Sequence, residues 1–318
     1  MPKILFVNHG HGDRCGVWNY GDRYFRSLIS DDSYTFIYVD VTSEEGFDSA
    51  FQEHSPDALI FNYAPIVMPW VSTSLSRYRV PKFVMQHNYE QKTLDGIHSR
   101  YHGIFNYVVV LDPTITGIPG RVFSLPRPIP EPPKSELSFS PDDEEIRIGS
   151  FGFALPHKQF PLLAAEINRC FDKAVFNLHM TEGRFAAGYT PSILESVQRE
   201  ITKPGILLVH TSNYLPEEGV VENLGQNHIN ALFYDWPPED AGLSSSTDFM
   251  MASRRPMLLS NCAMFNHVRR GSFMYPAVTF TDILGDFRNC EDEARQLYSR
   301  SRGQVDVETK AMLRSVGI

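Results

Sequence analysis

The sequence has 318 residues, of which 42% are hydrophobic and 21% charged, and its formal net charge is −9. This length favours about two domains of about 150 residues each, and the composition excludes a disordered chain. An acidic chain with scattered lysines and arginines argues against nucleic-acid binding, which requires a dense basic surface. No apolar run approaches the ~20 residues that span a bilayer, and the four cysteines lack CxxC spacing. We therefore expect a cytoplasmic protein with free thiols and no transmembrane segment.

The first part of the chain alternates short apolar runs with amphipathic segments. This alternation is typical of βαβ units and of a mostly parallel sheet. The segments between the apolar runs are long enough for crossover helices, so we expect a doubly wound, Rossmann-like α/β domain over residues 1–125. Its predicted strands are residues 3–8, 35–41, 57–62, 82–86 and 106–111.

A proline-rich segment over residues 126–145 follows, and its prolines are incompatible with a regular helix or a central strand. We predict a linker there. The alternation then restarts, which predicts a second Rossmann-like domain over residues 146–318 that ends in helical segments near 287–300 and 306–316. Its predicted strands are residues 146–151, 174–179, 205–209, 230–234, 256–260 and 277–280.

Ligands of open parallel sheets bind beyond the carboxyl ends of the strands. The first loop of this kind contains Gly10, Gly12 and Gly16. Glycines let backbone amides approach an anion at a helix N-terminus, although a flexible loop with solvated histidines is the alternative. The loop lacks a GxGxxG fingerprint followed by an acidic residue, so a nicotinamide cofactor is not expected.

A histidine, His87, lies at the carboxyl end of the predicted strand 82–86. A neutral imidazole in this place could hydrogen-bond a sugar hydroxyl or move a proton. The alternative is a polar residue that only caps the strand.

Two segments of the second half are candidates for phosphate binding. In the first, a strand leads through Gly152 to Lys158, whose compact charge suits a diphosphate unless it is an ordinary surface lysine. In the second, Ser244, Ser245 and Ser246 precede a predicted helix, whose N-terminal amides and hydroxyls suit phosphate oxygens. Ordinary N-capping without a ligand is the alternative for the serines.

Taken in order, these segments resemble the retaining GT-B glycosyltransferases, a nucleotide-sugar-dependent family that includes sucrose and mannosyl transferases. The similar segments are RCGVWNYGDRYFRSL, QHN, GSFGFALPHKQF and GLSSSTDFMMASRRPMLLSN. The resemblance implies two Rossmann-like domains that face each other across a cleft, with the acceptor on the first and the nucleotide-sugar donor on the second.

The same resemblance assigns roles to individual residues. It places Lys158 on the donor diphosphate, the amides of Ser244–Ser246 on the phosphate oxygens, and His87 near the transferred sugar. Asp248 joins His87 and Lys158 as a catalytic candidate, and the donor is also lined by glycines: Gly10, Gly12, Gly16 and Gly152. Fixed cations and helix-end amides stabilise a leaving diphosphate without a metal ion or a cofactor, and no His/Asp cluster has metal-ligand spacing.

Two motifs depart from the family pattern. An arginine usually precedes the phosphate-loop lysine, and here His157 is the one possible stand-in. The family also has two glutamates with seven residues between them, a spacing that Asp240 and Asp248 share. An alignment anchored on Pro256 instead places Ala241 and Phe249 at those positions.

The sequence thus predicts a hexosyltransferase that moves a sugar from a nucleoside diphosphate sugar to a hydroxyl of a glycan, lipid or small molecule, with retention. The alternatives are a catalytically inactive GT-B-like module that binds or scaffolds, and an epimerase or hydrolase that acts on the nucleotide sugar itself.

Overall fold

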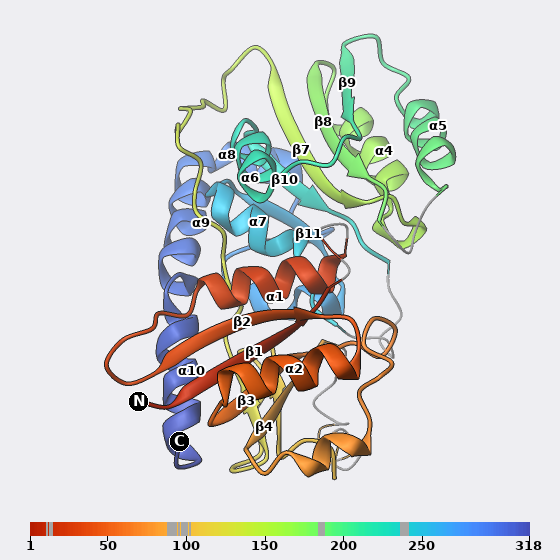
Figure 1. Cartoon of the computed structure of the whole chain (residues 1–318). Helices are drawn as coiled ribbons and strands as arrows, with labels where there is room; N and C mark the ends of the chain where they lie inside the picture. Colours follow the sequence, from red (N-terminus) through yellow and green to blue (C-terminus); the bar gives the residue numbers. More distant parts are fainter. Residues whose placement is uncertain are drawn as a thin grey trace. The chain divides into compact units, whose positions relative to one another are not determined.

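The computed structural model describes residues 1–10, 12, 15–87, 94, 96, 101, 103–183, 188–235 and 242–318. These residues form two compact units, each built around its own parallel sheet (Figure 1). Unit 1 comprises the described residues of Met1–Pro128, Glu239–Leu243 and Arg302–Ile318, and unit 2 those of Ile129–Pro238 and Ser244–Ser301. The predicted fold class, two doubly wound α/β domains, is confirmed.

Unit 1 contains a six-stranded parallel sheet in the order β2-β1-β3-β4-β5-β6. Every strand predicted in this half is present, together with β6, which the sequence analysis did not predict. The elements are β1 (Lys3–His9), α1 (Gly16–Arg26), β2 (Thr35–Val41), α2 (Glu44–His54), β3 (Ala58–Asn62), η1 (Thr73–Arg77), β4 (Lys82–Gln86), β5 (Tyr107–Val110), β6 (Val122–Ser124) and α10 (Gln304–Ser315).

Helices cover both faces of this sheet, so its central strands are apolar on both sides. On β1, Ile4 and Phe6 pack with Tyr24 of α1 and Leu313 of α10. The alternate residues of β1 belong to the core on the opposite face, to which α2 contributes Phe47. This double burial explains why β1 and β3 appear as continuous apolar runs in the sequence.

The C-terminal helix α10 belongs to unit 1. The hydroxyls of Tyr24 and Thr309 lie 2.6 Å apart in the interior, and Lys310 Nζ lies 2.7 Å from Asp31 Oδ2. The helix itself is confirmed, whereas the sequence analysis assigned all of residues 146–318 to the second domain. Amphipathic periodicity predicts a helix, but it carries no information about which of two cores the apolar face joins.

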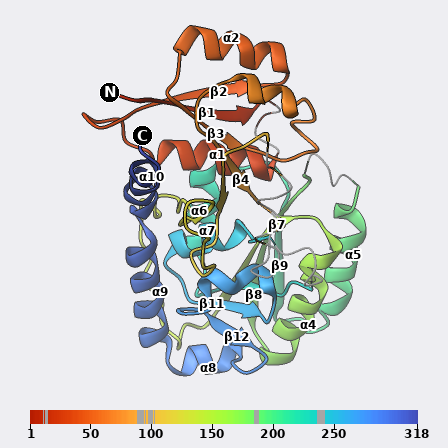
Figure 2. The ribbon, with the colours of Figure 1, turned by 90° about the horizontal axis from the view of Figure 1, so that it is seen from below.

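Unit 2 contains a second six-stranded parallel sheet, in the order β12-β11-β10-β7-β8-β9. Helices α4, α5 and α8 contribute to the core on one face, α6 and α7 to the core on the other, and α9 to both (Figure 2). The elements are β7 (Ile146–Phe153), η3 (Pro156–Lys158), α4 (Phe160–Cys170), β8 (Ala174–Thr181), α5 (Thr190–Glu200), β9 (Ile206–Thr211), α6 (Glu217–Gly225), β10 (Ile229–Leu232), α7 (Ser246–Ser253), β11 (Met257–Ser260), η5 (Ala263–Val268), β12 (Phe273–Tyr275), α8 (Phe280–Gly285) and α9 (Phe287–Ser301).

The strand predicted at 277–280 is wrong. The last strand, β12, ends at Tyr275 before Pro276, which lacks the amide hydrogen that a sheet ladder needs. Thr279 then caps α8, accepting from the amide of Asp282 while the Asp282 carboxylate accepts from the amide of Thr279. This capping box commits the segment to a helix. Residues 126–145, all of which are described, contain no helix or strand, as predicted.

Candidate functional site

Each sheet has one point at which the direction of winding reverses. In unit 1 this switch point lies between β1 and β3, and in unit 2 it lies between β7 and β10. Crevices form outside the carboxyl ends of strands at such points and are where ligands of this fold class bind. The predicted residues His87, Gly152 and Lys158 lie at or just beyond the carboxyl ends of the central strands β4 and β7.

In unit 2, Lys158 is held close to the end of β10. Its side chain is only 8% exposed, and its Nζ donates to the hydroxyl of Tyr234 while lying 4.0 Å from the centre of that ring. A Cβ at Gly152 would lie 3.2 Å from Lys158 Nζ. Glycine at this position therefore leaves room for the lysine side chain.

The Tyr234 hydroxyl connects Lys158 to the start of α7. It accepts a hydrogen bond from Ser244 Oγ at 3.3 Å and donates one to Ser246 Oγ at 3.1 Å. The structure thus brings together Gly152, Lys158, Ser244 and Ser246. Tyr234 was not among the predicted residues, because its place at the switch point depends on the strand order.

The amides of the serine segment are partly engaged within unit 2. The Ser244 amide donates to Met264 O at 3.1 Å, and the Ser246 amide lies 3.3 Å from Ser244 Oγ. Ser245 is the N-cap of α7 and its side chain makes no capping hydrogen bond. The hydroxyls of Ser244 and Ser246 are therefore candidate hydrogen-bond donors to an anion, as are the amides that the resemblance places on the phosphate oxygens.

Asp248 lies inside unit 2. Its side chain is fully buried, with Oδ1 3.9 Å from His267 Nε2. The next residue, Phe249, packs edge-on against Phe151 with 5.2 Å between the ring centres. The other acid of the sequence pair, Asp240, lies outside the described residues, so the catalytic role assigned to Asp248 stays a prediction.

His157 does not supply the positive charge of the arginine that it replaces. Burial and the neighbouring Lys158 cation lower the pKa of His157 to about 4. The ring is neutral at pH 7, and it packs edge-on against Tyr234. Lys158 is thus the cation that the described part of this loop offers to an anion.

In unit 1, His87 is the end of a hydrogen-bonded chain that continues through two buried asparagine side chains. Its Nε2 lies 2.8 Å from Asn62 Oδ1, and Asn62 Nδ2 donates to Asn8 Oδ1 at 2.8 Å. The sheet brings the three residues together, because β1, β3 and β4 are neighbouring parallel strands whose carboxyl ends lie side by side. The sequence analysis named only His87, although asparagines that end two apolar strands were a readable signal.

Aromatic and cationic groups surround the imidazole. The ring of Tyr20 meets His87 edge-on with 5.4 Å between centres, and Arg127 Cζ lies 4.8 Å from the centre of the Tyr20 ring. Burial, Arg127 and His9 lower the pKa of His87 to about 3. His87 is thus neutral at physiological pH.

The predicted glycines of the first loop lie between β1 and α1. The Gly10 amide donates to Val41 O at 3.0 Å, and Gly12 has a φ of +85°, which favours glycine. Gly16 is the first residue of α1, whose N-cap, Cys15, makes no side-chain capping bond. Their role in lining a donor site stays a prediction.

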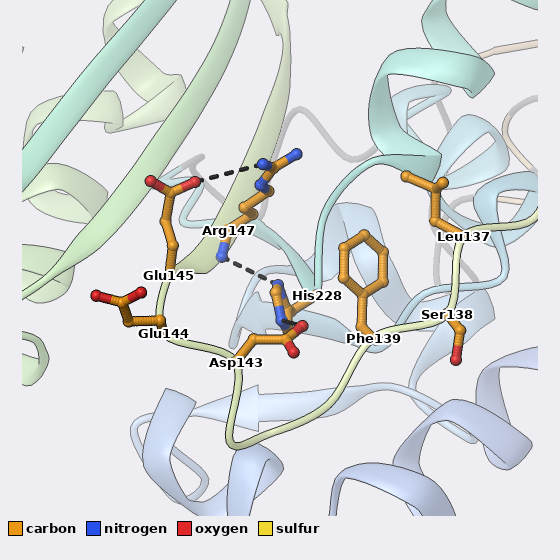
Figure 3. Close-up of a pocket in the computed structure, with 8 residues that line it drawn as sticks. All are labelled: Leu137, Ser138, Phe139, Asp143, Glu144, Glu145, Arg147 and His228. Carbon is orange, nitrogen blue, oxygen red and sulfur yellow. Dashed lines mark hydrogen bonds and ion pairs between the residues drawn. The ribbon is translucent and has the colours of Figure 1, made fainter.

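A separate pocket of about 370 Å³ lies at the amino-terminal edge of the sheet in unit 2 (Figure 3). Its His228 is fixed on both ring nitrogens: Nδ1 accepts from the Arg147 amide at 3.1 Å and Nε2 lies 3.0 Å from Asp143 Oδ2. The pocket contains none of the predicted site residues. It is lined by Leu137, Ser138, Phe139, Asp143, Glu144, Glu145, Arg147 and His228.

Two further findings concern the described residues only. None of their helices is both long and apolar enough to cross a membrane. They also contain no group of three or more His, Cys, Asp or Glu side chains arranged to hold a metal ion.

No protein-family model and no curated protein matches the sequence. Solved structures do match. Anabaena HepE in complex with UDP and glucose is similar with a TM-score of 0.67 at 10% identity, over 99% of this chain and 100% of that one. A UDP-forming trehalose-phosphate synthase from Burkholderia xenovorans gives a TM-score of 0.63 at 9% identity, over 99% of each chain. A glycosyltransferase from Rickettsia africae gives 0.58 at 10% identity, over 99% of this chain and 97% of that one.

These similarities establish the fold. The chain has the GT-B fold of two Rossmann-like domains, as its resemblance to GT-B glycosyltransferases predicted.

Proposed function

We propose that the protein is a glycosyltransferase that moves a hexose from a nucleoside diphosphate sugar to an acceptor hydroxyl. The observation that carries the proposal is the cluster at the switch point of unit 2. There Lys158 and the hydroxyls of Ser244 and Ser246 converge on Tyr234 ahead of helix α7. A cation, hydroxyls and a helix N-terminus are together what a diphosphate requires.

The chemistry follows from the leaving group. Departure of a nucleoside diphosphate develops negative charge on its phosphate oxygens, and preorganised donors stabilise this charge most effectively where water is excluded. Lys158 is such a donor, because its side chain is buried and its position is fixed by Tyr234. We propose that this stabilisation operates without a metal ion or a cofactor.

We further propose that residues 1–125 form the acceptor-side domain together with α10, residues 126–145 the linker, and residues 146–301 the donor domain. In this scheme neutral His87 contacts the transferred sugar, and a glycan, lipid or small molecule supplies the acceptor hydroxyl.

The free cysteines, Cys15, Cys170, Cys262 and Cys290, support a cytoplasmic location.

The HepE structures hold UDP and UDP-glucose, which supports a uridine nucleotide as the donor base. We expect UDP and UDP-glucose to stabilise the protein against thermal unfolding, by about 2.7 kcal/mol when the ligand is at a hundredfold excess over its Kd. GDP and ADP at the same concentration are the matched comparison. A larger shift with GDP or ADP would reassign the donor, and no shift with any nucleotide would contradict the proposal.

Retention is the second part of the proposal. We expect the product to keep the anomeric configuration of the donor, which NMR coupling constants of the product formed from UDP-α-glucose report directly. Where no acceptor is known, water takes its place. The anomeric configuration of the released sugar must then be measured before mutarotation interconverts the anomers. A product of inverted configuration would overturn retention and leave sugar transfer intact.

The inactive binding module remains a second candidate, because two observations favour it. Neutral His157 does not replace the missing arginine, and Asp248 is buried inside unit 2. Such a module would be stabilised by UDP-glucose and yet consume none of it, with or without added acceptors.

A further inference from the structure

The side-chain amide of Asn62 has only one possible orientation. One of its terminal atoms lies 2.7 Å from the backbone carbonyl of Val17 and 2.8 Å from Asn8 Oδ1. A carbonyl oxygen can only accept, so the atom that faces Val17 must be the NH₂ group. The other atom, Oδ1, is therefore the one that lies 2.8 Å from His87 Nε2.

Asn8 is oriented by backbone groups in the same way. Its Nδ2 donates to Trp18 O at 3.1 Å and to the Tyr38 hydroxyl at 2.9 Å, and its Oδ1 accepts from the His9 amide at 3.0 Å. A carbonyl on one side and an amide N–H on the other allow no flipped alternative. Both asparagines have side chains with no exposed surface.

This chain determines the protonation of the imidazole. Asn62 Oδ1 can only accept, so Nε2 of His87 must carry a hydrogen atom. Burial, Arg127 and His9 keep the ring neutral. A neutral imidazole has one N–H, and Nδ1 is consequently left unprotonated as a hydrogen-bond acceptor.

We propose that Asn8 and Asn62 are positioning residues that hold His87 in its Nε2–H tautomer, so that Nδ1 accepts a hydrogen bond from a sugar hydroxyl. The contact with a sugar rests on the proposed function, whereas the tautomer does not. His87 then acts by orienting a hydroxyl, and it does not deliver a proton to a leaving group at neutral pH.

The test is ¹⁵N NMR of the full-length protein with labelled histidine, at pH 7, with the His87 signals assigned from a His87→Gln variant. We expect an unprotonated Nδ1 and a protonated Nε2, with no averaging between tautomers. An Asn62→Ala variant should show a mixture of tautomers. Asn230→Ala removes an equally buried amide from unit 2, where it bonds Ser253 and Leu224, and should leave the His87 signals unchanged.

Several outcomes would overturn the proposal. A protonated Nδ1 or a doubly protonated ring in the unmodified protein contradicts it without reference to any variant, so a variant that fails to fold leaves the test intact. A single tautomer in folded Asn62→Ala would show that Asn62 does not position the ring.

Ligand additions test the sugar contact. UDP-glucose should shift the Nδ1 resonance towards the hydrogen-bonded range, whereas UDP alone should not. A shift with free glucose but not with UDP-glucose would identify an acceptor sugar as the partner. If UDP-glucose stabilises the protein but neither sugar moves Nδ1, the acceptor role is wrong. If UDP-glucose does not bind at all, the proposed function fails and the tautomer result stands.

Discussion

Replacing Lys158 by alanine is expected to lower kcat/KM for UDP-glucose by about 100- to 1,000-fold, the usual effect of removing one preorganised donor from a developing oxyanion. The lysine is buried, fixed by Tyr234 and accompanied by a neutral His157, so no neighbouring cation in the described loop replaces it. The steady-state rate of UDP release from UDP-glucose measures the effect.

A matched control is Lys173→Ala. Lys173 is an exposed lysine of the same unit, and its Nζ lies 2.7 Å from the exposed carboxylate of Glu144. Exposed ion pairs contribute little, so this variant should keep both turnover and stability. A folded Lys158→Ala protein with unchanged kcat/KM would show that Lys158 only tethers Tyr234 and does not stabilise the leaving diphosphate.

Much of the fold could be predicted from the sequence because a parallel sheet buried on both faces produces apolar runs. β3 and β4 are fully buried, and both were placed almost to the residue. The errors arose where another signal decided the structure. The capping box of Thr279 and Asp282 formed a helix where the sequence suggested a strand, and α10 joined the core of unit 1.

The candidate site was predictable only in part. Gly152, Lys158 and the serines could be named as candidates because their residue types suit a diphosphate and they adjoin a strand or a helix. Tyr234 and the asparagines Asn8 and Asn62 were missed, since their importance depends on which strands are neighbours. That information is in the strand order, which reverses between β1 and β3 and between β7 and β10, and not in the spacing of residues along the chain.

The role of Gly21 also depends on its neighbours in space. Its contacts predict that an alanine lowers the free energy of unfolding, whereas helix propensity alone predicts that it raises it. Gly21 lies inside α1, where alanine is normally favoured over glycine by about 0.5–1 kcal/mol. A Cβ at this position would, however, lie 2.3 Å from Asn62 Nδ2 and 2.9 Å from Asn8 Nδ2. The missing side chain of Gly21 is thus what lets the two amides reach α1.

We therefore expect Gly21→Ala to lower the free energy of unfolding by about 1–3 kcal/mol, the usual cost of overpacking a core, as measured by urea denaturation. Gly46→Ala is the control, because Gly46 is an exposed residue of α2 and the nearest atom to its new Cβ would be Ser43 Oγ at 3.7 Å. That variant should be more stable by about 0.5–1 kcal/mol. Two glycines in two helices should thus respond with opposite signs, because only Gly21 faces the asparagines that orient His87. If Gly21→Ala proved as stable as Gly46→Ala, the asparagine chain would have to tolerate displacement, and His87 would not be rigidly positioned.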